Sequence, residues 1–270
     1  MENISAPRLL SRGIYTGSVK NSIITEGITL NETEYVPERY EGGPHYHENP
    51  HITLVFLGGD VEERNGNAYE RRAGEIFFYN AGEVHQTIFR TVTSKNLNIE
   101  LEGDYLKNLG LSEGQISGSI AENHEVKFLT LKLLEELTIG DDSSKTSIDL
   151  LLLDLITCCA RPLPNNLPYW ARELRNVLND RWSEQIPLNE LSDTLGIHRI
   201  TISKYFKKYF HCTYGEYTRR LKIDRSIPLV KDSKMSLTEV AVHCGFTDQS
   251  HFIKNFRKST GFLPKNFRRR

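Results

Sequence analysis

The stretch SLTEVAVHCGFTDQSHFIKNFRKSTG, residues 236 to 261, decides how this 270-residue chain is interpreted. Its first half carries apolar residues at helical spacing: Leu237, Val240 and Ala241. Gly245 supplies the turn after that helix, because glycine adopts the left-handed conformation without strain. Asp248 is placed to cap a second helix, in which Phe252 and Phe256 face inward four residues apart. Two short helices joined at a glycine turn predict a helix-turn-helix, whose second helix can enter a major groove.

A related pattern lies fifty residues earlier, in PLNELSDTLGIHRITISKYFKKYF, residues 187 to 210. Its apolar positions at helical spacing are Leu188, Leu191, Leu195, Ile202 and Phe206. Gly196 supplies the turn, and His198 takes the place that Asp248 holds in the later stretch. The repeat therefore predicts two helix-turn-helix units, which could reach two major grooves one turn apart on the same face of a duplex.

The balance of acidic and basic side chains changes just before these repeats. Residues 1 to 168 hold 14 basic and 25 acidic side chains, whereas residues 169 to 270 hold 20 basic and 10 acidic ones. A basic domain of this kind is typical of proteins that bind a polyanion. The alternative is a basic surface without a partner.

The stretch GFTDQSHFIKNFRKSTGFLPKNFR, residues 245 to 268, carries a resemblance to a known family. Its GF pair, its spaced phenylalanines and its terminal G-x-x-P are similar to the signature of the AraC/XylS family of bacterial transcription regulators. The match extends over residues 186 to 270. It implies an all-α domain of two helix-turn-helix units that binds double-stranded DNA and usually activates transcription beside RNA polymerase.

The resemblance also implies which side chains face the DNA. The first recognition helix would present Arg199, Ile200, Thr201, Ser203 and Lys204, and the second would present Gln249, Ser250, Ile253 and Lys254. Glutamine can pair with adenine through two hydrogen bonds, serine can bond either way, and isoleucine can pack on a thymine methyl group. Arginine and lysine can contact guanine or only hold phosphate. For each polar residue the alternative is a solvated helix face.

Several residues depart from the family pattern. They are Ser192, His198, His211, Lys222 and Ser226. Pro228 stands out, because it lies in GEYTRRLKIDRSIPLV, residues 215 to 230, a predicted connecting helix. Inside a helix, proline removes a backbone hydrogen bond at a cost of about 3 kcal/mol. Pro228 is therefore expected either to strain this helix or to end it early.

The acidic half begins with short apolar runs between about residues 14 and 101: SIITEGITL, HITLVFLGG, EIFFYNAG, HQTIFRTV and KNLNIEL. β-branched and aromatic residues dominate these runs, which is typical of many short antiparallel strands in a barrel or jelly roll. Two predicted helices follow, HEVKFLTLKLLEELTI at 124 to 139 and TSIDLLLLDLITCCA at 146 to 160. Three prolines in RPLPNNLP, residues 161 to 168, predict a linker.

A cluster of histidines, HYHENPH at residues 45 to 51, resembles the start of the cupin motif. In that motif H-x-H is followed by Glu, and later by G-x5-P-x-G-x2-H. The matching positions are His45, His47, His51 in the Glu position, Gly74, Asn80 in the Pro position, Gly82 and His85. The resemblance implies a barrel that binds an effector.

The same histidines are candidate ligands for a divalent transition metal. Four imidazoles from two neighbouring strand regions could converge on one Zn, Cu, Ni or Fe ion. The alternative is that they bond a small-molecule effector, or brace the barrel mouth, without a metal. The carboxylate common in oxygen-activating sites is missing, because Glu48 is out of register. Its absence counts against a cupin metalloenzyme tethered to DNA.

Together these patterns predict an α+β protein of two domains. We expect a cupin-like antiparallel barrel over residues 1–120, a helical dimerisation segment over 121–160, a linker over 161–168 and an AraC-type DNA-binding domain over 169–270. By resemblance the helical segment forms a homodimer contact; the alternative is packing against its own barrel.

The predicted function is that of a cytoplasmic, sequence-specific transcription regulator, in most such proteins an activator. It would respond to a small-molecule or metal effector and would not be an enzyme. The rivals are the tethered metalloenzyme and an architectural DNA binder that needs no ligand. No membrane association is expected, because the most apolar run, IDLLLLDLI at 148 to 156, is far shorter than a bilayer span.

Overall fold

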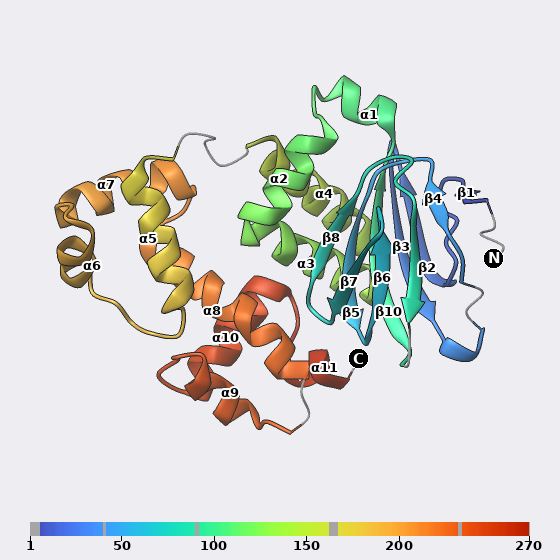
Figure 1. The fold of residues 1–270 in the computed structure, drawn as a ribbon. Helices are drawn as coiled ribbons and strands as arrows, with labels where there is room; N and C mark the ends of the chain where they lie inside the picture. Colours follow the sequence, from blue (N-terminus) through green and yellow to red (C-terminus); the bar gives the residue numbers. More distant parts are fainter. Residues whose placement is uncertain (1–5, 40–41, 90–91, 162–166, 232–233, 270) are drawn as a thin grey trace. The chain divides into compact units, whose positions relative to one another are not determined.

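The computed structural model describes residues 6–39, 42–89, 92–161, 167–231 and 234–269. The chain divides into two compact units, one of residues 1–121 with 129–160 and one of residues 122–128 with 161–270. The first unit contains β-sheets and helices, and the second is helical, so the α+β class is confirmed (Figure 1). Most of the predicted linker, residues 162–166, lies outside the described residues. No helix in the described part of the chain is both long and apolar enough to cross a membrane.

The strands of the first unit form two five-stranded sheets. They are β1 (Arg8–Leu10), β2 (Ser18–Thr25), β3 (Ile28–Tyr35), β4 (His45–His47), β5 (His51–Leu57), β6 (Gly59–Arg64), β7 (Asn67–Arg72), β8 (Ile76–Tyr79), β9 (His85–Phe89) and β10 (Ser94–Leu101). One sheet has the order β1-β4-β9-β6-β7 and the other β2-β3-β10-β5-β8. Within the described residues no ladder joins the two sheets, so the closed cupin-like barrel is not confirmed.

The second sheet has one polar and one apolar face, because successive side chains of a strand point to opposite sides. On β10, Asn96 and Asn98 line a cavity that side chains of the other sheet also line. Leu97 and Ile99 point the other way and are fully buried. The apolar core therefore covers the outer face of this sheet, and polar side chains fill the space between the sheets.

Four helices follow the strands: α1 (Gly103–Asn108), α2 (Glu113–Glu122), α3 (His124–Ile139) and α4 (Ser144–Ala160). Figure 1 shows α2, α3 and α4 beside the strands. The predicted apolar face of α3 is buried within the chain, and Leu133 on this face is 0% exposed. On α4, Leu150 and Leu153 are 59% and 63% exposed, so this helix is not buried on all its apolar sides.

The second unit is built from seven described helices. They are α5 (Tyr169–Asp180), α6 (Leu188–Leu195), α7 (Arg199–Phe210), α8 (Tyr214–Lys231), α9 (Leu237–His243), α10 (Gln249–Thr260) and α11 (Pro264–Arg269). The predicted repeat is present, because α7 and α10 are both 12 residues long and start fifty residues apart. Phe206 of α7 and Phe256 of α10 hold equivalent buried positions. Each helix pair α6–α7 and α9–α10 is a helix-turn-helix.

The unusual residues of this unit have local roles. His198 caps α7, and its side chain accepts a hydrogen bond from the backbone N–H of Ile200. His211 ends α7 in the left-handed conformation, with φ of +56°, where glycine is usual. Pro228 does not end α8 early, because the helix continues to Lys231. Only one backbone donor is lost there, so the helix tolerates the proline in its last turn.

Candidate functional sites

The two recognition helices, α7 and α10, expose one matching face each. The exposed members of the predicted set are Arg199, Ile200, Ser203, Lys204, Gln249, Ser250 and Lys254, and Ile253 is half-buried. Ile200 is 63% exposed, which leaves an apolar side chain free to meet an apolar partner such as a thymine methyl group. Thr201 lies about 200° around α7 from Arg199 and is half-buried, so it does not share this face.

The first residue of each recognition helix is held by the helix that precedes it. The hydroxyl of Thr238 in α9 donates to Oε1 of Gln249 at 2.7 Å. The guanidinium of Arg199 donates to Oδ1 of Asn189 in α6 at 3.2 Å. Oε1 of Gln249 keeps a second lone pair, so the amide can still accept one hydrogen bond and donate another, as pairing with adenine requires. Both side chains are thereby held in one orientation by the preceding helix.

Sequence reasoning missed the cations in the last turn of each of these helices. Lys207 and Lys208 of α7 occupy the positions that Arg257 and Lys258 hold in α10, and all four are exposed. The fifty-residue repeat contains the signal that would have found them, because the charge is the same in both copies while the residues at the helix start differ. Cations placed alike suit phosphates, which carry no sequence information.

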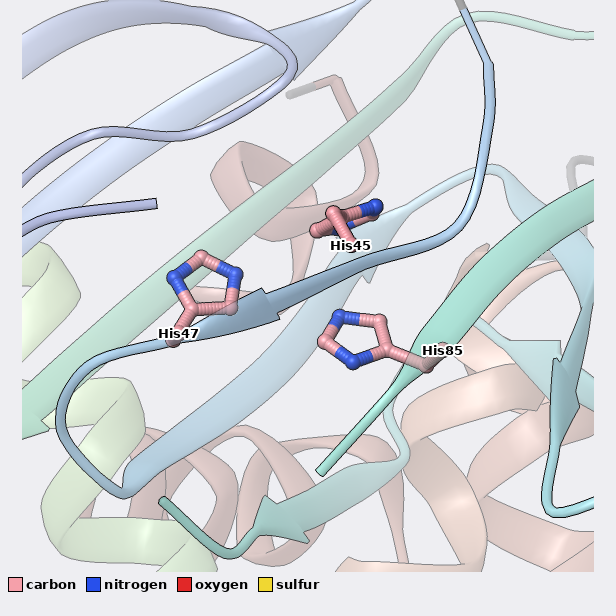
Figure 2. Close-up of side chains that lie close together, drawn as sticks. All are labelled: His45, His47 and His85. Carbon is pink, nitrogen blue, oxygen red and sulfur yellow. The ribbon is translucent and has the colours of Figure 1, made fainter. Parts of the chain in front are cut away.

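A separate cluster of three histidines lies between the two sheets of the first unit. His45 and His47 share one face of β4, and His85 opens β9 directly opposite His45. One nitrogen of each ring lies within 4.8 Å of those of the other two, and all three side chains are buried. Figure 2 shows the three rings turned toward a common space.

His51, the fourth predicted member, stands beside this triad. Its ring lies 4.3 Å from that of His47, centroid to centroid, and stacks on Tyr79 at 4.5 Å. It is not among the three whose nitrogens converge within 4.8 Å. The structure therefore brings together His45, His47 and His85 and leaves His51 as a neighbour.

Burial disfavours protonation of the triad, and backbone carbonyls fix the tautomer of two of its three rings. Nδ1 of His45 donates to the carbonyl of Gly43 at 3.0 Å, and Nδ1 of His85 donates to the carbonyl of Glu83 at 2.9 Å. A carbonyl only accepts, so Nε2 of both rings carries a free lone pair. Burial lowers the pKa of His47 to about 3 and that of His85 to about 2. Converging neutral imidazoles with free lone pairs are the ligands that zinc and similar ions prefer.

The cavity around the triad is small, and the residues that line it are polar. Its volume of about 20 Å³ is enough for one ion or one water. Glu62 also lines it, but its carboxylate is already held by Arg64, Arg71 and Tyr79. The cavity thus contains a carboxylate that the motif did not predict, and this carboxylate is committed to other partners.

Two buried polar atoms beside the triad have no hydrogen-bond partner among the described residues. They are Nδ1 of His47 and Nδ1 of His51. The phenol oxygen of Tyr15, whose ring lies 5.0 Å from that of His47, is a third such atom. Buried polar groups are rarely left unpaired. The residues present therefore fit a polar occupant, and Tyr15 is a lining residue that no histidine motif could have indicated.

The second unit is similar to proteins of a known family. Residues 191–270 match the model of the family described as "Helix-turn-helix domain". Among curated proteins, the HTH-type transcriptional activator RhaS of Escherichia coli O157:H7 is 23% identical over 247 residues, covering 83% of this chain and 86% of that protein.

Solved structures show weaker likeness. A transcriptional regulator with an AraC-type DNA-binding domain from Chromobacterium violaceum matches 37% of this chain and 89% of its own, at 20% identity and a TM-score of 0.35. Apo ToxT from Vibrio cholerae matches 89% of this chain and 96% of its own, at 9% identity and a TM-score of 0.37.

Proposed function

We propose that this chain is a DNA-binding transcription regulator with an AraC-type helix-turn-helix domain, and that it contacts an operator through α7 and α10 together. The observation that carries this proposal is the repeated exposed face of the two helices, with different residues at the helix start and the same charges at the end. Because the exposed residues at the start of α7 differ from those at the start of α10, we expect two half-sites of different sequence. Because the last turn carries the same positive charges in both helices, we expect each half-site to be held through its phosphates.

Selection from random DNA with the full chain tests this proposal. A bound sequence with two unlike half-sites about one helical turn apart is the expected result. Arg199→Ala should relax selection in one half-site and Gln249→Ala in the other, whereas the matched surface variant Lys145→Ala should change neither. Selection of a single short site, insensitive to either substitution, would contradict the use of both helices.

We further propose that the space between the sheets is the effector site, with His45, His47 and His85 as ligands for one divalent transition metal. When bound, such an ion supplies a charge and an open position for an oxygen ligand. The chain's own part is to present two bare Nε2 atoms, fixed by carbonyls, inside a small polar cavity. The second candidate is a small polar effector without metal, which the unpartnered atoms of Tyr15, His47 and His51 favour; an effector larger than one water would require side chains around the cavity to move.

Elemental analysis and calorimetry of the untagged chain separate these candidates. A metal site predicts one Zn²⁺, Co²⁺ or Ni²⁺ per chain, lost in His85→Ala and kept in the control His243→Ala, which changes an exposed histidine of α9. Operator affinity should shift when the ion binds, because the function proposed is regulation. Absence of binding at a hundred micromolar metal would leave the metal-free effector as the surviving candidate.

Two further proposals concern assembly. The family resemblance and the exposed leucines of α4 support a homodimer in the cytoplasm, in which Leu150 and Leu153 meet a second copy. Thr146, Leu150, Leu153 and Thr157 follow one another at steps of four, three and four residues, the spacing of a coiled-coil seam. Contact with RNA polymerase is proposed from the resemblance, together with activation of transcription.

A further inference from the structure

A buried lysine links the two helix-turn-helix units. Lys222 lies in α8, the helix between the units, and is only 7% exposed. Its Nζ donates to the backbone carbonyl of Gly245 at 2.8 Å. No ion pair to Lys222 is found within the described residues. A cation buried without a carboxylate is unfavourable, so a lysine here is hard to explain by stability alone.

The turn that Lys222 holds is also packed from the other side. Gly245 has φ of +69°, and a Cβ built on it would lie 1.7 Å from the carbonyl oxygen of Ser183 and 2.9 Å from Nζ of Lys222. Ser183 follows α5, whose Leu178 shares one buried core with Leu191 of α6 and Phe206 of α7, so this segment moves with the first helix-turn-helix unit. The ring of Trp182 lies 5.9 Å from that of His243, at the end of α9. The α9–α10 turn is therefore clamped between α8 and the segment after α5.

The turn of the first unit has no such clamp. Gly196 is also left-handed, with φ of +63°, but a Cβ built on it would meet no atom within 4 Å. The two turns have the same backbone requirement and opposite surroundings. If helix-turn-helix geometry itself required close packing at the glycine, both turns would be closely packed. Only the α9–α10 turn is, so its packing indicates a joint between the two units.

We propose that Lys222 is a positioning residue for DNA recognition, which fixes α10 relative to α7 by holding the carbonyl of Gly245. This inference rests on the proposed use of both recognition helices. Two helices that must enter grooves about 34 Å apart bind best when their separation is set in advance. With the joint fixed, binding of one helix places the other at its half-site, and the second contact becomes intramolecular.

The substitution Lys222→Met tests the proposal, because it keeps the length of the stem and removes the donor. The selected operator, each half-site alone, and operators with one or two base pairs inserted between the half-sites are titrated at fixed salt. We expect Lys222→Met to weaken binding to the operator by about tenfold or more and to change half-site binding by less than about threefold. The variant should also lose the wild-type preference for one spacing.

Conservative and independent variants complete the test. Lys222→Arg keeps a donor at this position, so this variant should keep the operator affinity and the spacing preference of the wild-type chain. Lys254→Ala is the contrasting control, because it should weaken the half-site as well as the operator. Circular dichroism verifies that each variant is folded; if Lys222→Met is not, Lys222→Leu, which also lacks a donor, takes its place with the same expectations.

The proposal is overturned if Lys222→Met keeps the wild-type spacing preference, or if it weakens half-site and operator binding equally. These outcomes differ from failure of the two-helix function itself. In that case the wild-type chain would select a single half-site and show no spacing preference, which would remove both inferences.

Discussion

We expect the exposed side chains of α7 and α10 to divide into those that contact bases and those that hold phosphate. Gln249 is oriented by Thr238 at the start of α10, where a helix enters a groove. Lys254 lies one turn further on and has a replica in Lys204 of α7. A residue that differs between the two repeats can select a particular DNA sequence. A residue that is the same in both repeats suits the phosphate backbone, which is the same in every DNA sequence.

Substitution of Gln249 and of Lys254 by alanine should therefore have different effects. Gln249→Ala should cost about 1–3 kcal/mol on the operator and almost nothing on random DNA. Lys254→Ala should weaken both and reduce the salt dependence of binding by about one unit of slope. Fluorescence anisotropy titrations at several salt concentrations measure both quantities. Unchanged operator affinity in both variants would exclude α10 as a recognition helix.

The buried histidines predict a particular response to acid. In the folded unit, burial keeps the pKa of His47 near 3 and that of His85 near 2, whereas the ordinary value is 6.5. Their contribution to stability is therefore complete above pH 6.5 and is lost as the pH falls toward those folded values, because the unfolded chain takes up the protons first. Each histidine contributes a slope of up to about 1.4 kcal/mol per pH unit.

Calorimetry in the presence of a chelator measures this slope. The transition of the second unit is identified by fluorescence, because Trp170 and Trp182 both belong to it. His85→Gln should flatten the acid dependence of the first unit by about one proton. An equal slope in the variant and the wild type would show that His85 takes up its proton equally in the folded and the unfolded state, which would contradict the lowered pKa.

The sequence predicts part of the histidine site and not the rest. The H-x-H spacing puts His45 and His47 on one face because strands alternate. Whether His85 stands opposite His45 depends on the register of β4 and β9, which local spacing does not contain. Tyr15 and Glu62 come from segments with no motif, so only the folded chain brings them to the cavity.

Among the elements, the helices were predictable and the closure of the sheets was not. Amphipathic spacing and glycine turns are local, so α6, α7, α9 and α10 follow from the sequence. Alternation in the strands predicts a sheet, but it does not say which strand pairs with which. The order β2-β3-β10-β5-β8 joins strands far apart in the chain. Pro228 shows where local sequence fails to predict a helix. Proline disfavours a helix interior, but packing along α8 outweighs that preference.

The glycine turns themselves offer a matched experiment. Gly196→Ala should lose about 1 kcal/mol of unfolding free energy, because alanine disfavours positive φ, and the same cost applies to Gly245→Ala. Gly245→Ala should lose clearly more, since its Cβ would meet the carbonyl of Ser183. Urea unfolding followed by tryptophan fluorescence reports on this unit. Equal losses in the two variants would mean that the α9–α10 turn is not closely packed.

The whole molecule combines an acidic first unit with a basic second unit. The excess of acidic side chains before residue 169 repels phosphate, so the first unit has no electrostatic reason to lie on DNA. Its exposed apolar residues on α4 suit a protein partner instead. A second copy is the partner we propose, since two copies would double the number of half-sites bound at once.

Leucines on neighbouring helices test this assembly. Leu153→Asp would place an unpaired charge on the proposed seam of α4, so the dimer dissociation constant should rise by about a hundredfold or more while the fold stays intact. Leu133→Asp is the contrasting variant, because Leu133 is fully buried in its own chain and a charge there should unfold the first unit. Sedimentation at micromolar concentration, with circular dichroism, distinguishes the two effects. A wild-type chain that is monomeric under these conditions, or a Leu153→Asp variant that remains dimeric, would show that α4 does not form the contact.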